Sequence, residues 1–178
     1  MNTTKNDPLL TVSRIIIRIV QAILGIAAVA LTIGIPIILL AKDEILAELR
    51  EETGNMAATF PHWEVAAVML AALAVVVLSF LFLRKLLAII DTVGAGDPFV
   101  PINAERLTHM AWLMVAVQAV TIAIVPLIVR VQMAFEETNP TMDAEVDLGG
   151  TVLAITLFIL ARVFRQGSAM RADLEGTV

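Results

Sequence analysis

The chain has no cysteine and no tyrosine, only two histidines, and few charged residues, which make up 16% of its 178 residues. Without cysteine it has no disulfides, no thiolate metal ligands and no cysteine nucleophile. Soluble domains carry roughly 25% charged residues, whereas this chain is 59% hydrophobic and has a mean hydropathy of +0.90. These deficits exclude an ordinary soluble fold and indicate a membrane protein. The net charge of −5 also argues against direct nucleic-acid binding.

Long uncharged runs occupy much of the chain. Residues 19–41, 65–83 and 110–129 contain no charged side chain. As a helix, each run is long enough to cross a hydrocarbon core about 30 Å thick. We therefore predict that each forms a membrane-spanning helix.

A fourth apolar run, residues 148–161, has only 14 residues, and by length alone it also fits a buried or interfacial helix. Arg162 and Arg165 follow it, and long basic side chains can extend toward lipid headgroups, which lengthens the usable apolar segment through Phe164. We therefore predict an all-α, polytopic membrane protein with a single four-helix domain over residues 1–178. The predicted spans are 15–41, 65–83, 108–129 and 147–164, with outer loops 42–64 and 130–146, an inner loop 84–107 and an inner tail 165–178.

Basic residues divide unevenly between the two sides of these spans. Nine of the twelve lie on the side that holds both termini and the inner loop, and three lie on the other side. Because cytoplasmic loops of membrane proteins are enriched in Lys and Arg, we expect both termini to be cytoplasmic. The prediction is an antiparallel four-transmembrane-helix bundle in the bacterial cytoplasmic (inner) membrane. Its first span is expected to be retained, because its apolar run exceeds the roughly 7–15 residues of a signal peptide.

Small and polar residues inside the spans predict how the helices associate. Pairs of small residues at four-residue spacing allow close backbone approach, and one pair occurs on every span: Ala30/Gly34, Ala67/Ala71, Ala119/Ala123 and Gly150/Ala154. Gln21 and Gln118 are the intramembrane polar residues of most interest. We expect them to hydrogen-bond across helices, although residues of this kind can also line a narrow polar path.

Proline and glycine predict bends and helix ends. Pro36 and Pro126 lie inside predicted spans, where static bends are expected and hinges are the alternative. The segment 42–53 has apolar residues on one helical face and is followed by Gly54-Asn55, so we predict a short helix that ends there.

The sequence contains no arrangement that indicates catalysis. His62 and His109 fall on opposite sides of the predicted membrane, and a metal site usually needs three or four donors. "GAGDP" (94–98) lacks the Gly-Lys-Ser/Thr ending of a phosphate-binding loop and is expected to be a turn. We therefore predict a protein that is not an enzyme and has no catalytic residue, cofactor or metal.

Two inner segments carry more specific sequence than the spans. Pro98 and Pro101 restrict the loop around Phe99, and Asn103 is expected to be the N-cap of the next helix. Gly167 is expected to be a C-cap, and Met170 and Leu174 lie beyond it among charged residues. Packing of the tail against the loop, or of both segments against another protein, would explain these apolar residues. The predicted partner interface consists of Pro98, Phe99, Pro101, Asn103, Glu105, Arg106, Arg165, Arg171, Asp173, Leu174 and Glu175.

"DPFVPINAERL" (97–107) and "RQGSAMRADLEGTV" (165–178) resemble signatures of a bacterial membrane family, domain of unknown function 2975. The resemblance extends over nearly the whole chain, with four hydrophobic segments in the same arrangement. The family has no established activity and so implies no catalytic residues. Its members are often encoded beside small Cro-like helix-turn-helix regulators. The resemblance thus implies a membrane protein that senses, tethers or is controlled alongside a cytoplasmic DNA-binding partner.

The function expected from the sequence is regulatory or scaffolding, through protein–protein contact at the cytoplasmic loop and tail. The expected partners are membrane lipid and a cytoplasmic protein, with the helix-turn-helix regulator implied by the family resemblance. Two alternatives remain open: an oligomeric channel, transporter or efflux component built as a homo-oligomer, and a lipid-binding or membrane-complex assembly factor.

Overall fold

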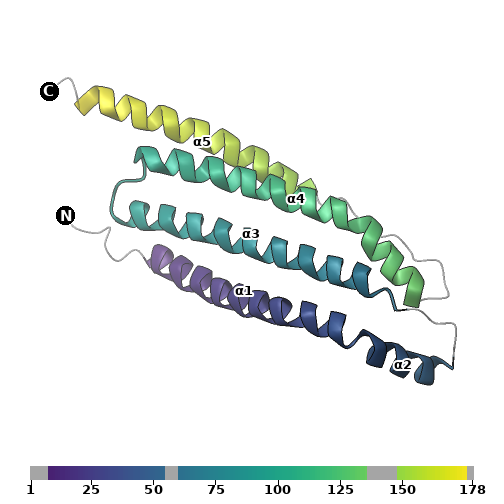
Figure 1. Ribbon diagram of the computed structural model, residues 1–178. Coiled ribbons are helices and arrows are strands. Elements are labelled where there is room, and N and C mark those ends of the chain that lie inside the picture. The colour runs from purple at the N-terminus through teal and green to yellow at the C-terminus, as the bar shows by residue number, and fades with distance from the viewer. Residues whose placement is uncertain (1–7, 55–59, 136–147, 176–178) are drawn as a thin grey trace. The chain divides into compact units, whose positions relative to one another are not determined.

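The computed structural model describes residues 8–54, 60–135 and 148–175, and every regular element within them is an α-helix. The helices are α1 (Pro8–Leu40), α2 (Lys42–Thr53), α3 (His62–Gly94), α4 (Pro101–Phe135) and α5 (Leu148–Glu175) (Figure 1). The predicted all-α class is confirmed.

Four of these helices are long and apolar enough to cross a membrane. The most apolar stretches of α1, α3, α4 and α5 have mean hydropathies of 2.7, 2.9, 2.4 and 1.7. Many of their large apolar side chains are exposed, as Ile26 and Leu40 are. Exposure of this kind costs nothing in hydrocarbon, and a helix satisfies its own backbone hydrogen bonds there. The prediction of a membrane protein with four candidate spans is confirmed.

The helices extend well past the apolar runs. Helix α3 continues to Gly94 and α4 begins at Pro101, so most of the predicted 84–107 inner loop is helical. Only residues 95–100 connect the two helices, and we call them the 95–100 connection. Charged side chains end an apolar run, but they do not end a helix, because the backbone hydrogen bonds continue past them.

Gly96 provides the backbone conformation that ends α3. Gly96 has a φ of 85°, a left-handed conformation that glycine adopts without steric cost. Its N–H donates to the carbonyl of Val93 at 3.0 Å, and the N–H of Asp97 donates to that of Thr92 at 3.1 Å. This pair of bonds is a Schellman motif, which satisfies the last carbonyls of a helix. "GAGDP" is therefore a turn, as predicted.

Two predicted helix caps are wrong. Asn103 is not the N-cap of α4, because the helix already begins at Pro101, where proline suits the first helical position. Gly167 is not a C-cap, because α5 passes through it and ends at Glu175. A Cβ atom at Gly167 would lie only 2.8 Å from the ring of Phe99. This glycine therefore allows a close contact within a continuous helix.

The predicted helix before Gly54 is confirmed. It is α2, and Gly54 caps it in the left-handed conformation with a φ of 65°. Gly54 thus ends the helix in the same way that Gly96 ends α3, by taking a conformation that other residues rarely adopt.

The chain divides into two compact units. Unit 1 comprises Met1–Gly25, Leu78–Gln118 and Asp147–Val178, and unit 2 comprises Ile26–Val77 and Ala119–Val146. Helices α1, α3 and α4 contribute residues to both. The predicted single domain stays a prediction.

Unit 1 contains nearly all of the buried side chains. Its apolar core consists of Ile89, Leu107, Met110, Ala111, Leu157 and Ala161, with Phe82, Leu86, Val93 and Phe164 packed against it. On α5 the buried residues Gly150, Ala154, Leu157 and Ala161 follow helical spacing and so form one face.

The predicted pairs of small residues differ in whether they pack against another helix. Gly150 and Ala154 lie on the buried face of α5, as predicted for a packing pair. In unit 2, Gly34 lies close to the side chain of Met69, since a Cβ atom on the glycine would come within 2.9 Å of it. Ala119 and Ala123 are exposed, so the prediction that they form a close helix contact is wrong.

Substitution of Ala154, which is 4% exposed, tests the packing of the buried face of α5. We expect Ala154→Leu to lower the free energy of unfolding by about 1–3 kcal/mol, because the added atoms have no space among close-packed neighbours. Thermal unfolding in mild detergent measures the change. Ala169→Leu, at an exposed position of the same helix, is the matched control and should melt like the unmodified protein. Equal melting of both variants would contradict the described core.

Candidate functional site

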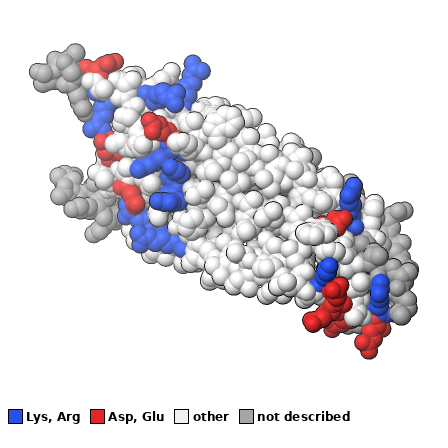
Figure 2. All heavy atoms as spheres, in the orientation of Figure 1, with Lys and Arg blue, Asp and Glu red and all other residues white. Residues whose placement is uncertain are grey.

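Charged side chains gather where the ends of several helices meet in unit 1. Figure 2 shows Lys and Arg crowded there beside a broad surface without charge. We call this region the basic end. Its basic residues are Arg14, Arg18, Arg84, Lys85, Arg106, Arg162, Arg165 and Arg171.

The side chain of Asn103 lies at the centre of the basic end and is fully buried. Its Nδ2 donates to Thr92 Oγ1 at 2.7 Å and to the Pro98 carbonyl at 2.9 Å. Its Oδ1 accepts from Arg106 Nη1 at 2.9 Å. Both donor hydrogens and the acceptor oxygen are thus used, which is what a buried amide requires. One side chain therefore joins α3, the 95–100 connection and α4.

Arg106 extends this network along α3. Besides Asn103, its Nη1 donates to the Ala88 carbonyl at 2.9 Å. Thr92, which accepts from Asn103, donates its own hydroxyl to the Ile89 carbonyl at 2.7 Å. Hydrogen bonds from a guanidinium are stronger than neutral ones. The network therefore fixes the first turns of α4 against the last turns of α3.

Helix α5 packs against the 95–100 connection through Phe99. The rings of Phe99 and Phe164 have centroids 5.4 Å apart, and Phe99 also lies against Gly167, where a side chain would collide with its ring. Beside this contact, Arg171 forms an ion pair with Asp97. The structure therefore supports the first of the two alternatives for the tail, packing against its own loop.

Helix α1 joins the basic end through Arg14. Its Nε lies 2.9 Å from Asp91 Oδ1. Gly94 makes room for the same guanidinium, because a Cβ atom there would overlap Arg14 Nη2. The two side chains are 31% and 56% exposed, so the pair contributes about 0–1 kcal/mol. It positions α1 more than it stabilises the fold.

Sequence reasoning missed several residues of this network. Thr92 and Asp91 fall within the predicted inner loop 84–107, and Asp97 within the predicted turn 94–98. A signal was present: Asp91 and Thr92 come directly after the apolar run 86–90, on the side where basic residues are concentrated.

The structure brings the predicted interface residues together in unit 1 and divides them by accessibility. Asn103 is buried, Pro98 and Arg106 are half-buried, and Arg171 is exposed but engaged with Asp97. Phe99 is 41% exposed. The remaining exposed residues are Pro101, Glu105, Arg165, Asp173 and Leu174. Glu175 ends α5, and its side chain lies outside the described residues.

The two intramembrane glutamines belong to unit 1. The Nε2 atom of Gln118 occupies the position where a Cβ of Gly150 would lie, so this side chain is part of the contact between α4 and α5. Gln21 is half-buried on α1. That they hydrogen-bond across helices stays a prediction.

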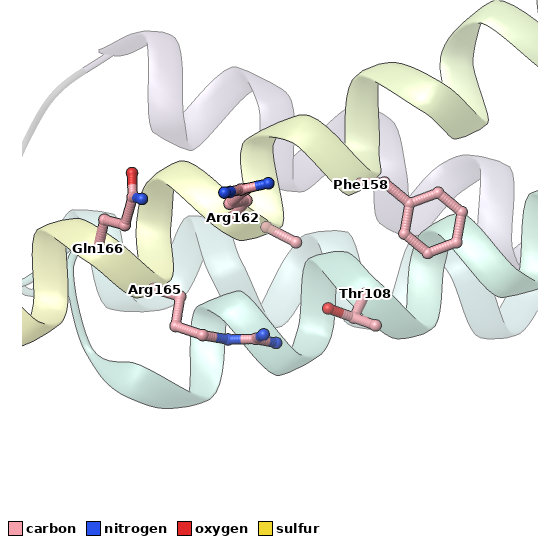
Figure 3. Close-up of a pocket in the computed structure, with 6 residues that line it drawn as sticks. Thr108, Phe158, Arg162, Arg165 and Gln166 are labelled. Atoms are coloured by element: carbon pink, nitrogen blue, oxygen red, sulfur yellow. The ribbon is translucent and has the colours of Figure 1, made fainter.

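Two pockets with basic side chains lie in unit 1. The larger has a volume of about 450 Å³ and is lined by Thr108, Phe158, Ala161, Arg162, Arg165 and Gln166 (Figure 3). The smaller, about 290 Å³, is lined by Leu81, Lys85, His109, Trp112 and Leu113. Among the described residues, no group of three or more His, Asp or Glu side chains is placed to hold a metal ion.

The model of the family DUF2975, described as a protein of unknown function, matches residues 45–178. The chain belongs to this family. The match confirms the resemblance predicted from the two inner segments, and it includes the 95–100 connection and all of α5. In this DUF2975 protein the match begins within α2 and leaves α1 outside. No curated protein and no solved structure matches the chain.

Removal of the Asn103 side chain tests the network. We expect Asn103→Ala to lower the free energy of unfolding by about 1–3 kcal/mol, because Thr92, Pro98 and Arg106 lose a buried partner. Glu105→Ala, two residues along the same helix and exposed, should change it by less than about 0.5 kcal/mol. Thermal unfolding in detergent measures both, and an Asn103→Ala variant as stable as the Glu105→Ala variant would rule out a stabilising network.

Proposed function

We propose that this DUF2975 protein is a bacterial inner-membrane protein with a regulatory or scaffolding role, acting through contact between its basic end and a cytoplasmic protein. The observation that carries the proposal is the exposure of apolar side chains on helical segments past the apolar runs. Met170 is 63% exposed and Leu174 is 72% exposed. Apolar side chains that lie in water, away from lipid, are stabilised when a partner covers them.

These exposed residues continue an existing contact surface. Gly167, Met170 and Leu174 are three and four residues apart, so they lie along one face of α5. Phe99 already covers this face at Gly167. Ile102, which is 45% exposed, follows the same connection. A partner would thus extend the packing that Phe99 begins.

The proposal includes an antiparallel four-helix bundle with both termini in the cytoplasm. Contacts at the basic end support it. Arg14 joins the start of α1 to Asp91 near the end of α3, and Phe99, just before α4, packs against Phe164 of α5. The concentration of Lys and Arg at these helix ends supports a cytoplasmic location.

We propose binding rather than catalysis at the basic end, because its innermost polar groups are used to bond helices to one another. Asn103 and Arg106 hold α4 against α3, and Asp97 holds Arg171 of α5. The partner we propose is a cytoplasmic helix-turn-helix regulator, as the family resemblance implies. A DNA-binding protein held at this surface would be kept at the membrane.

The orientation can be tested directly because the chain has no cysteine. We expect Leu174→Cys to react with a membrane-impermeant maleimide only after cells are permeabilised, and Ala47→Cys, on an exposed position of α2, to react in intact cells. Both substitutions replace exposed residues and should fold normally. Labelling of residue 174 from outside would overturn the proposed orientation.

The contact surface can be tested by crosslinking in native membranes. We expect a photoreactive thiol probe at Leu174→Cys to capture a DNA-binding protein that mass spectrometry identifies. Ala172→Cys is the matched control, because it is exposed on the same helix but points about 160° away at 100° per residue. Met170→Asp should abolish the capture. Capture of only a second copy of this chain, or equal capture at residues 172 and 174, would contradict the proposal.

A further inference from the structure

Two arginines, Arg162 and Arg165, line the larger pocket of unit 1. Arg162 and Arg165 are three residues apart on α5, so they share a face. Figure 3 shows Arg165 reaching from α5 across α4 in the direction of Thr108, with Arg162 between it and Phe158 along α5. Gln166 completes the polar part of the lining, and Phe158 and Ala161 form its apolar part.

These two positive charges have no counter-charge within the part of the chain that the structure describes. Three arginines at the basic end are engaged: Arg14 with Asp91, Arg171 with Asp97, and Arg106 with backbone and amide oxygens. The guanidinium groups of Arg162 and Arg165 make no ion pair or hydrogen bond among the described residues. A guanidinium group suits bidentate binding of phosphate oxygens.

The apolar side of the pocket indicates where that phosphate is attached. Phe158 lies one helical turn from Arg162 in the direction of the apolar run, and its ring packs edge-on against Trp112 at 5.6 Å. Trp112 is 61% exposed, and tryptophan is typical of the level where headgroups meet hydrocarbon. A phospholipid whose phosphate group is bound by the arginines would therefore place its acyl chains along Trp112 and Phe158.

Thr108 indicates the rest of the headgroup. Its hydroxyl donates to the Ala104 carbonyl at 2.9 Å, so its oxygen is left to accept a hydrogen bond. A phosphate oxygen cannot supply that hydrogen, whereas a hydroxyl on the headgroup can.

We propose that this pocket binds the headgroup of an anionic, hydroxyl-bearing phospholipid such as phosphatidylglycerol. Arg162 and Arg165 bind its phosphate, Thr108 and Gln166 bind its hydroxyls, and its acyl chains lie along Phe158 and Trp112. Basic pockets at the ends of membrane helices bind lipid headgroups in this way. The site is independent of a protein partner, so it stands or falls separately from the proposed function.

Tryptophan fluorescence tests the proposal in reconstituted vesicles. The chain has two tryptophans, so Trp63→Phe leaves Trp112 as the only emitter beside the pocket. In mixed vesicles of phosphatidylglycerol and phosphatidylcholine, acyl chains brominated on one lipid or the other quench Trp112 according to which lipid is next to it. We expect phosphatidylglycerol to be preferred at Trp112 by about tenfold, the effect of one or two charge-assisted hydrogen bonds.

The variant Arg162→Gln/Arg165→Gln should abolish this preference. The matched control, Arg18→Gln/Arg84→Gln, removes the same charge from exposed positions of the basic end that do not line the pocket and should retain it. Equal quenching by both lipids in the unmodified pocket would overturn the proposal. Equal loss of preference in both double variants would do so too, because it would indicate general attraction to a charged surface.

A second experiment distinguishes binding of a lipid from binding of a free anion. In lipid-free detergent, we expect short-chain phosphatidylglycerol to raise the melting temperature of the protein, and inorganic phosphate at the same concentration to have no effect. The rise should be absent in the Arg162→Gln/Arg165→Gln variant. Equal stabilisation by inorganic phosphate would show that the acyl chains contribute nothing and would overturn the assignment to a lipid.

Discussion

Hydrocarbon offers no hydrogen-bond partner to the backbone, and the rest of this structure depends on that constraint. A segment inside the bilayer has to satisfy its own N–H and C=O groups, and charged side chains are driven to its ends. The chain meets the constraint with four long helices whose most apolar stretches carry almost no charge. Polar interactions are consequently concentrated at the helix ends, and the basic end of unit 1 is where the described chain places most of them.

At that end, a few polar groups whose hydrogen-bond donors and acceptors all have partners determine how the helices are aligned. Apolar side chains gain little by leaving lipid for protein, so the spans themselves associate through close packing. Asn103 adds a directional element, since its amide has partners on α3, the 95–100 connection and α4. Glycine adds close approach, since Gly94, Gly150 and Gly167 each leave space that a neighbouring side chain occupies. Together they fix which helix turns lie side by side.

The sequence predicted what depends on hydrophobic length and on local geometry. The all-α class, the four candidate spans, α2 with its cap at Gly54, and the packing role of Gly150 and Ala154 all follow from such patterns. The predictions that failed concern tertiary contacts. Asn103 is a residue type common at N-caps, and Gly167 is one common at C-caps, but each lies inside a helix. Asn103 bonds to Thr92 on α3, and Gly167 lies against the ring of Phe99. Local propensity contains no information about those partners. The two arginines of the larger pocket have no ion pair among the described residues, and this was likewise visible only once the ion pairs of Arg14 and Arg171 were known.

The shortness of the 95–100 connection has a mechanical consequence. The connection has only six residues. The Schellman hydrogen bonds hold one of its ends and the amide of Asn103 bonds to its middle, so the ends of α3 and α4 have little freedom to separate. We therefore expect these two helix ends to move together, with the ring of Phe99 packed against α5. If α5 slid along its axis, a residue with a side chain would take the place of Gly167 against the ring of Phe99 and would collide with it. The contact between Phe99 and Gly167 therefore resists sliding of α5.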